Sequence, residues 1–282
     1  MNKLRKDEIF ILCTKLNVVD ILKLSQIDKN IRRDEIWIYK LKEDFPIFEN
    51  FKENYNKKQL YELLYKLNIL KEKLKLKVNI YELYYLNIID SRQNQLTIIP
   101  KEICNLINLR EITLNYSHIT EIPKEVCSLI NLETLVLCSN KITEIPKEIC
   151  NLINLRKLDL GKNEITEIPK ELGKLTNLER FGLYCNNISE LPKELGDLTN
   201  VSDFHISDNK LKEIPKELSN LLNLETLYLY NNQLETIPDE LFHLPKLKII
   251  SAFNNKYLKI SSRNLRNKTL KIFLHSSSNK SL

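Results

Sequence analysis

The chain has 282 residues, 43% hydrophobic and 28% charged, which is enough for one large domain or two small ones. Only four glycines occur, at positions 161, 173, 182 and 196, which excludes the glycine-rich phosphate loops of P-loop and Rossmann enzymes. No stretch approaches the ~20 apolar residues that a membrane helix needs, and the N-terminal segment lacks the apolar run of a signal peptide.

The charge is distributed unevenly along the chain. The 43 lysines and arginines outnumber the 37 aspartates and glutamates, giving a formal net charge of +6. Residues 1–80 carry +6, residues 81–255 carry −7 and residues 256–282 carry +7. A nucleic-acid-binding protein normally places its positive charge on its largest surface. We therefore expect no nucleic-acid partner, and only the tail could serve one.

Residues 7–45 show apolar side chains at helical spacing in three groups. The groups are Ile9, Leu12 and Leu16; Ile21, Leu24 and Ile27; and Trp37, Leu41 and Phe45. Asn17 and Asp20 separate the first two groups as helix caps, and Pro46 ends the last. The pattern predicts three short helices, a bundle too small to be very stable without a partner.

Residues 4–45 resemble an F-box, the adaptor-binding module of Skp–cullin–F-box ubiquitin ligases. Leu4, Asp7 and Leu16 match the first part of the family pattern, Asp20–Lys29 follow its central stretch, and Ile36–Trp37 match its late pair. Arg5 stands where the pattern has proline, and Ile31 where it has tryptophan. The resemblance implies a Skp-type adaptor as partner, bound through Leu4, Leu16, Leu22, Leu24, Ile27, Lys29 and Trp37. The alternative is an unrelated helical cap for the remainder of the chain.

Residues 49–80 predict a helix that links the F-box-like segment to the remainder of the chain. Its apolar stripe consists of Leu60, Leu63, Leu64, Leu67 and Leu70. We expect this stripe to pack against the first repeat of the next segment, in preference to binding a partner helix.

From about residue 86 onward the sequence repeats every 23 residues. Asparagines stand at 94, 140, 163, 186, 209, 232 and 255, Ser117 fills the one gap, and a proline follows six residues after each of these positions up to 232. Numbered from this Asn column, the apolar residues fall at −8, −5, −3, +2 and +5. The pattern is that of leucine-rich repeats, with one strand per repeat. It predicts an α/β solenoid, a leucine-rich-repeat horseshoe of about eight repeats over residues 81–260, preceded by a small all-α F-box-like head.

Each recurring feature of the repeat has a structural interpretation. The Asn column, Asn94, Asn140, Asn163, Asn186, Asn209, Asn232 and Asn255, should satisfy backbone groups at a turn, because an amide both donates and accepts hydrogen bonds. Each proline excludes a central strand and predicts an extended or 3₁₀ segment on the convex face. Lys147 and Glu148, which follow one proline, belong to a solvated charge stripe. The repeat length and its Ile-Pro ending resemble those of Ras-suppressor-type and bacterial leucine-rich proteins.

No group of residues supports catalysis or metal binding. Three of the six cysteines, Cys104, Cys127 and Cys150, share one repeat position and are close enough for pairing by distance. An odd column without a Cys-x-x-Cys motif argues against zinc or a disulfide framework, and so many thiols favour the reducing cytoplasm. The four histidines are scattered, so no nucleophile–base pair can be nominated. We expect a protein that is not an enzyme and uses no cofactor.

The parallel strands should line the concave face, where the −6, −4 and −2 positions point outward. Residues at −4 and −2 vary between repeats, as expected for a binding surface on a constant scaffold. The partner-binding candidates come from the last repeats: Tyr184, His205, Tyr228, Tyr230 and Phe253. The alternative is the ordinary preference of tyrosine for strands.

Together these features predict a non-catalytic adaptor without a membrane partner. Residues 1–48 would bind the Skp-type adaptor, residues 49–80 would link or cap, residues 81–260 would capture an unknown target protein, and residues 261–282 would form a basic C-terminal cap and tail. The rival hypothesis is a stand-alone interaction scaffold with no link to ubiquitin.

Overall fold

A computed structural model describes residues 34–45, 56–93, 95–261 and 270–274 of the chain. Its contacts divide the chain into two compact units, Met1–Tyr85 and Leu86–Leu282. The first two of the three predicted N-terminal helices lie outside the described residues, as does Asn94.

The described part of the first unit is helical. It contains α3 (Asp34–Asp44), α4 (Lys57–Leu74) and α5 (Ile80–Tyr84). Asn56 caps α4, since its side chain accepts the Gln59 N–H at 2.9 Å while Gln59 accepts a bond from the backbone N–H of Asn56. Such a reciprocal pair satisfies two N–H groups that the first turn of a helix leaves unbonded. The helix predicted within residues 49–80 is therefore confirmed over Lys57–Leu74.

Aromatic rings form the core between α3 and α4. Trp37 is completely buried, and its ring lies 5.5 Å from that of Tyr61, centroid to centroid. Phe45 meets the same tyrosine edge-on, and the Tyr61 hydroxyl donates to the carboxylate of Asp44. Burial and this neighbouring carboxylate raise the pKa of Tyr61. The predicted leucine stripe of α4 is buried, whereas its packing against the first repeat stays a prediction.

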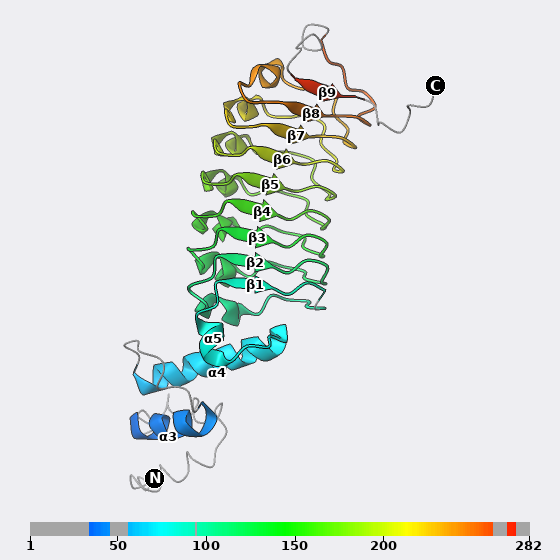
Figure 1. Ribbon diagram of the computed structural model, residues 1–282. Coiled ribbons are helices and arrows are strands. Elements are labelled where there is room, and N and C mark those ends of the chain that lie inside the picture. The colour runs from blue at the N-terminus through cyan, green and yellow to red at the C-terminus, as the bar shows by residue number, and fades with distance from the viewer. Residues whose placement is uncertain (1–33, 46–55, 94, 262–269, 275–282) are drawn as a thin grey trace, which may run out of the picture. The chain divides into compact units, whose positions relative to one another are not determined.

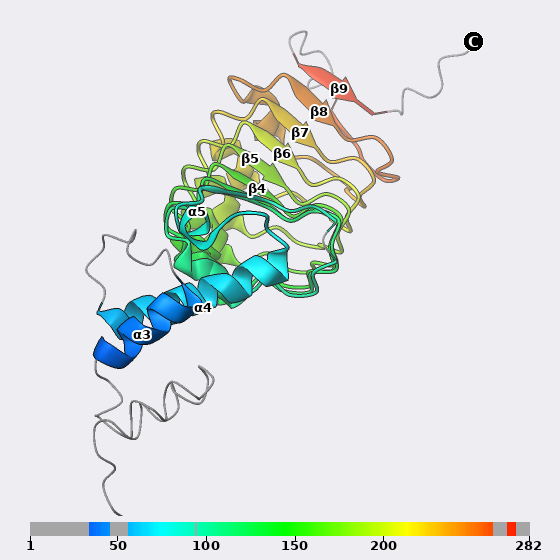
Figure 2. The ribbon, with the colours of Figure 1, turned by 60° about the horizontal axis from the view of Figure 1, so that its bottom comes forward.

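The described part of the second unit is a solenoid with one parallel sheet (Figures 1 and 2). Its strands hydrogen-bond in sequence order: β1 (Ile88–Asp90), β2 (Glu111–Thr113), β3 (Thr134–Val136), β4 (Lys157–Asp159), β5 (Arg180–Gly182), β6 (Asp203–His205), β7 (Thr226–Tyr228), β8 (Ile249–Ser251) and β9 (Lys271–Phe273). From β1 to β8 each residue pairs with the one 23 positions later, as Leu158 does with Phe181. The predicted α/β solenoid is confirmed.

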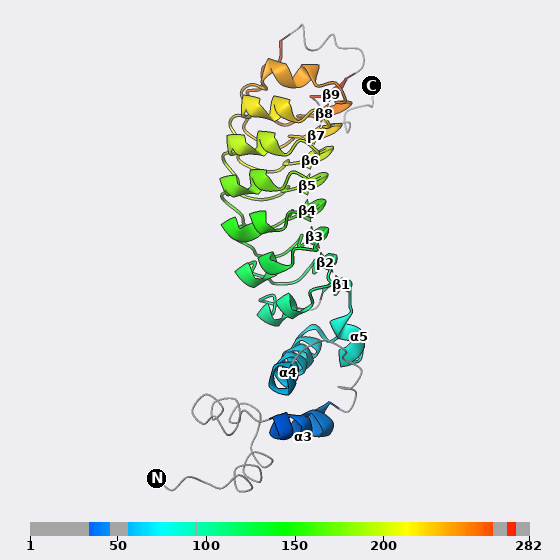
Figure 3. The same cartoon turned by 90° about the vertical axis from the view of Figure 1, so that its left-hand side faces the viewer.

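A short 3₁₀ helix follows each repeat proline on the side opposite the sheet (Figure 3). These turns are η3 (Lys101–Asn105), η4 (Lys124–Ser128), η5 (Lys147–Asn151), η6 (Lys170–Lys174), η7 (Lys193–Asp197), η8 (Lys216–Asn220) and η9 (Asp239–His243). Pro146 shows how each turn begins: it has no N–H to donate, but its carbonyl accepts the N–H of Ile149 at 2.9 Å. The sheet lines the concave side and the turns the convex side, as predicted (Figure 3).

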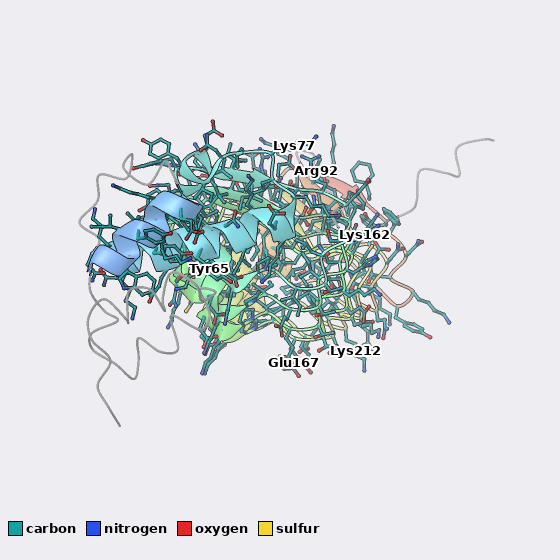
Figure 4. The ribbon with its side chains drawn as sticks, turned by 90° about the horizontal axis from the view of Figure 1, so that it is seen from below. Tyr65, Lys77, Arg92, Lys162, Glu167 and Lys212 are labelled. Atoms are coloured by element: carbon teal, nitrogen blue, oxygen red, sulfur yellow. The ribbon has the colours of Figure 1, made fainter. Side chains whose placement is uncertain are left out.

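The core of the solenoid is built from the predicted apolar columns. In the fourth repeat Leu155, Leu158, Leu160 and Ile165 are fully buried. Phe181 and Phe204 continue the column of Leu158, and their rings stack at 5.0 Å. Charged residues such as Lys162, Glu167 and Lys212 instead project from the outer surface (Figure 4). Apolar burial along the whole stack is what stabilises units that could not enclose their own leucines.

The Asn column forms a buried ladder of hydrogen bonds. Asn163 donates from Nδ2 to the carbonyls of Leu137 and Leu160, both at 3.0 Å, and accepts the Ile142 N–H at 3.0 Å. Each side chain therefore joins its own repeat to the preceding one. The same pattern recurs at Asn140, Asn186, Asn209, Asn232 and Asn255. The structural role predicted for the described members of this column is confirmed.

The structure contains two features that the repeat pattern did not predict. Strand β9 lies in the segment assigned to the tail, and Ile272 there pairs with Ile250, a step of 22 residues. Its irregular spacing hid it. In addition, Asn131, Asn154, Asn177, Asn200 and Asn223 form a second ladder, each donating to a carbonyl 24 residues earlier at 2.8–3.0 Å.

The five cysteines within the described residues form no disulfide with one another. Cys127 is buried, and burial raises the pKa of its thiol to about 12. A thiol with so high a pKa is almost entirely protonated at neutral pH and is therefore a poor nucleophile.

Candidate functional site

The five concave-face candidates lie on or just after four neighbouring strands. Tyr184 follows β5, His205 ends β6, Tyr228 ends β7 and Tyr230 follows it, and Phe253 follows β8. In each strand the central residue points into the core while its neighbours face solvent. All five side chains are partly exposed. We call this set, Tyr184, His205, Tyr228, Tyr230 and Phe253, the aromatic strip.

The rings of the aromatic strip touch one another in a continuous series. The ring of His205 stacks on Tyr184 with centroids 4.6 Å apart and lies 4.9 Å from the ring of Tyr228. Tyr230 stacks almost parallel on Phe253 at 4.5 Å. His205 and Tyr230 join the two groups, with centroids 5.8 Å apart. The structure thus brings together every residue proposed for the concave face, whereas their role in binding stays a prediction.

A polar network below the rings holds His205 in place. Its Nε2 lies 2.7 Å from Ser207 Oγ, and Ser207 in turn donates its hydroxyl proton to Asp208 at 3.0 Å. Because that proton is used, the Ser207 oxygen must accept from His205, so the neutral ring carries its proton on Nε2. Burial lowers the pKa of His205 below 6.5, against the opposing effect of Asp203, Asp159 and Asp208. The imidazole is therefore mainly neutral at physiological pH.

The close pairing of His205 and Ser207 does not make a hydrolytic centre. Ser207 has no exposed surface, so no substrate can reach its hydroxyl. Its proton is directed to Asp208, away from the imidazole that would have to remove it. The pair serves to orient the histidine ring. The sequence did not reveal it, because the two residues are informative only once they face the same way on one strand.

Two glycines shape the surface beside the aromatic strip. A Cβ at Gly161 would overlap the ring of Tyr184, so that ring lies directly over the glycine. Through this position the Tyr184 hydroxyl reaches the thiol of Cys138, two repeats away. A Cβ at Gly182 would lie 3.0 Å from Oδ1 of Asp159. Replacing side chains by hydrogen at these points lets the neighbours lean across adjacent strands.

The result is a shallow depression of about 450 Å³ on the concave face. Beside members of the aromatic strip, its lining includes the charged residues Lys157, Asp159, Arg180 and Asp203. Asp159 accepts the N–H of Gly161 at 3.0 Å. Burial nevertheless raises the pKa of Asp159, and the bond from Gly161 and the charge of Lys157 only partly oppose this. Nothing in the sequence distinguishes Asp159, because an outward-facing aspartate is ordinary.

The residues that the F-box resemblance assigned to adaptor binding are mostly outside the described part of the chain. Leu4, Leu16, Leu22, Leu24, Ile27 and Lys29 all fall within residues 1–33. Trp37 is described, and it lies buried against Tyr61 in the first unit. The structure therefore shows a packing role for this tryptophan.

Other kinds of site were sought in the described residues. There, no group of three or more His, Cys, Asp or Glu side chains is arranged to hold a metal ion. No helix within residues 34–45 or 56–93 combines the length and apolar character needed to cross a membrane, and the rest of the described chain adds none.

Comparison with known proteins gives the same result at the level of family. The model of the leucine-rich repeat region matches residues 64–208, and a second leucine-rich-repeat model matches residues 199–256. No F-box domain is found, and no curated protein sequence matches the chain.

Three solved structures are similar to the chain. A leucine-rich-repeat protein of Leptospira interrogans is 33% identical over 67% of this chain and 55% of its own, with a TM-score of 0.57. The internalin inlF of Listeria monocytogenes is 27% identical over 74% and 61%, with a TM-score of 0.63. The ectodomain of the Arabidopsis thaliana receptor kinase GASSHO1/SCHENGEN3, solved in complex with Casparian strip integrity factor 2, is 31% identical over 63% and 22%, with a TM-score of 0.53. This chain thus spans less than two thirds of each solved chain. With the repeat model matching more than half of its residues, the chain belongs to the leucine-rich-repeat family.

Proposed function

We propose that the protein is a non-catalytic adaptor that captures a target protein on the aromatic strip. Leucine-rich-repeat proteins are generally protein-interaction scaffolds. The observation that carries the proposal is the continuous series of stacked rings from Tyr184 to Phe253 on one rigid sheet. Aromatic side chains held in place lose little conformational entropy on binding and dominate interface energies. The similar receptor ectodomain, solved in complex with Casparian strip integrity factor 2, is a precedent for a bound partner on this fold.

The target-binding proposal is tested by comparing partners of the wild type with those of a Tyr228→Ala/Tyr230→Ala double variant. Proximity labelling in cells identifies partners even when the target is unknown. Each ring should contribute about 2 kcal/mol or more if it is a central anchor, so the double variant should lose its principal partners. The matched control is Lys147→Ala/Glu148→Ala on the convex face, where exposed charges contribute little. Unchanged partners in the double variant, with losses in the control, would refute the proposal.

We further propose that residues 1–48 bind a Skp-type adaptor, which makes the protein a substrate-recognition subunit of a cullin-based ubiquitin ligase in the cytoplasm. The support is the F-box resemblance of residues 4–45, and the order of such a segment before leucine-rich repeats. In this mechanism the N-terminal segment docks on the adaptor, the concave face presents the target, and the ligase carries out the chemistry. The alternative is a stand-alone scaffold or signalling regulator with no ubiquitin link.

Binding of a purified Skp-type adaptor to the whole chain separates the two functions. Calorimetry at tens of micromolar protein should detect binding if the segment is an F-box. Leu16→Asp or Leu24→Asp should abolish that binding while the circular dichroism of the repeats stays unchanged. Absence of binding by the wild type would favour the stand-alone scaffold and would leave the concave-face proposal untouched.

A further inference from the structure

One side chain is missing from the outward row of the concave face. The −4 positions of β4 to β7 are Asp159, Gly182, His205 and Tyr228. Neighbouring parallel strands lie about 4.8 Å apart, so Asp159 and His205 stand roughly two strand spacings apart with only the glycine between them. The depression of about 450 Å³ occupies this gap. Its width suits a single inserted side chain.

The carboxylate at one end of the gap lacks an ion-pair partner among the residues described. The ion pairs on this surface join other residues, such as Arg156 with Glu179 and Lys248 with Glu225. The side chain of Asp159 leans over Gly182 toward the depression, with Oδ1 3.0 Å from the position a Cβ would take. Taking a carboxylate partly out of water without a cation beside it is unfavourable. A cation entering the gap would remove that cost.

Aromatic rings and a second carboxylate complete the depression. His205, stacked on Tyr184 and tilted against Tyr228, faces Asp159 across the gap. The faces of tyrosine rings attract cations, and guanidinium groups also stack on them. Asp203 borders the depression on β6, whereas Lys157 and Arg180 border it on β4 and β5. The side of β6 therefore offers the more favourable approach for a positive charge.

We propose that this depression receives a cationic side chain of the target protein, with arginine the best fit, which pairs with Asp159 and stacks against Tyr184, His205 and Tyr228. The proposal rests on the proposed function, since it specifies what the aromatic strip recognises. Arginine is favoured over lysine because its planar group forms two parallel bonds to a carboxylate while it stacks on a ring.

The test uses N-acetyl-arginine amide as probe and N-acetyl-citrulline amide as its uncharged isostere. Both are titrated into the isotopically labelled whole chain, with the amide of Gly182 and the ring of His205 observed by NMR. The arginine probe should shift both signals with a millimolar dissociation constant, and the citrulline probe should bind about tenfold more weakly or not at all. Asp159→Asn should weaken arginine binding about tenfold or more, since it removes a charged hydrogen-bond partner.

Two further variants make the test specific. Glu167→Gln, which removes an exposed carboxylate on the outer surface (Figure 4), should leave the titration unchanged. Gly182→Val should abolish binding by filling the gap, and Val136 at the same position of β3 shows that the sheet accommodates valine there. Equal shifts with citrulline, or full binding by Asp159→Asn, would overturn the cation site.

The same variants in the labelling experiment separate this proposal from the one it rests on. If Tyr228→Ala/Tyr230→Ala loses partners while Asp159→Asn keeps them all, the cation site is wrong and the target-binding surface stands. If both variants keep every partner, the concave face is not the binding surface and both proposals fail.

Discussion

Replacing Asn163 by alanine tests the hydrogen-bond ladder that joins the repeats. The wild-type side chain accepts the N–H of Ile142 and donates to the carbonyls of Leu137 and Leu160. The two carbonyls each keep a second amide donor, because Asn140 bonds to Leu137 and Asn186 bonds to Leu160. The N–H of Ile142 has no other partner among the hydrogen bonds of the described residues. The variant therefore leaves one buried donor unsatisfied and weakens two acceptors.

The expected cost can be worked out from these lost bonds. A buried donor without a partner costs about 1–3 kcal/mol, and each lost second bond to a carbonyl adds less, so we expect the free energy of unfolding to fall by about 2–4 kcal/mol. Asn154→Ala is the matched control. It removes an exposed asparagine of the second ladder, whose single bond goes to the Ile130 carbonyl at 2.8 Å, and should cost less than about 1 kcal/mol because water can replace that bond.

Urea denaturation followed by circular dichroism measures both variants. Amide hydrogen exchange adds a local measurement, since the Ile142 N–H should lose protection in Asn163→Ala more than its neighbours do. An unchanged denaturation midpoint together with unchanged protection at Ile142 would show that the ladder does not stabilise the stack. Equal losses in both variants would show that burial of the first ladder adds nothing.

Three further variants probe the concave and convex faces. Gly161→Val should displace the ring of Tyr184 from its position over the glycine and weaken target binding about tenfold, with little change in the urea midpoint. Asp159→Asn should stabilise the fold at pH 7, because burial raises the pKa of Asp159 and makes its ionised form unfavourable; this gain should disappear as the pH falls below 3.8, where the wild-type carboxyl is protonated in both states. Gly173→Ala should destabilise by about 1–3 kcal/mol, since its Cβ would overlap the backbone carbonyl of Glu194, and an unchanged melting temperature would contradict the close approach of η6 and η7.

The scaffold was predictable because every structural position recurs. The strand register, the buried columns and the convex turns follow from periodicity alone, and an error in one repeat would have been contradicted by the next. Ser117, the exception in the Asn column, is still 5% exposed and occupies the same buried place. Strand β9 escaped prediction for the complementary reason, since its step of 22 residues breaks the period and no Ile-Pro pair precedes it.

The candidate site was predictable only in part. Alternation along each strand shows which side chains face outward, and constant spacing places those of neighbouring repeats side by side. It does not show which way a ring turns. Tyr184 lies across Gly161, and Asp159 leans over Gly182, because each glycine leaves space that a neighbour can occupy. Such contacts depend on the choice of rotamer, which a one-dimensional pattern does not contain.

The separation of scaffold and surface positions decides how binding experiments on this protein should be interpreted. Leu227 and Leu229 point into the core and are fully buried, while Tyr228 and Tyr230 between and beyond them face outward. Truncating the two tyrosines removes ring contacts above the sheet and leaves the apolar columns and the Asn ladder intact. A loss of partners in that variant with an unchanged unfolding free energy would therefore report on recognition. A loss of both would show that the stacked rings also stabilise the sheet, and binding would then have to be measured with the milder Tyr→Phe changes, which keep the rings and remove only their hydroxyls.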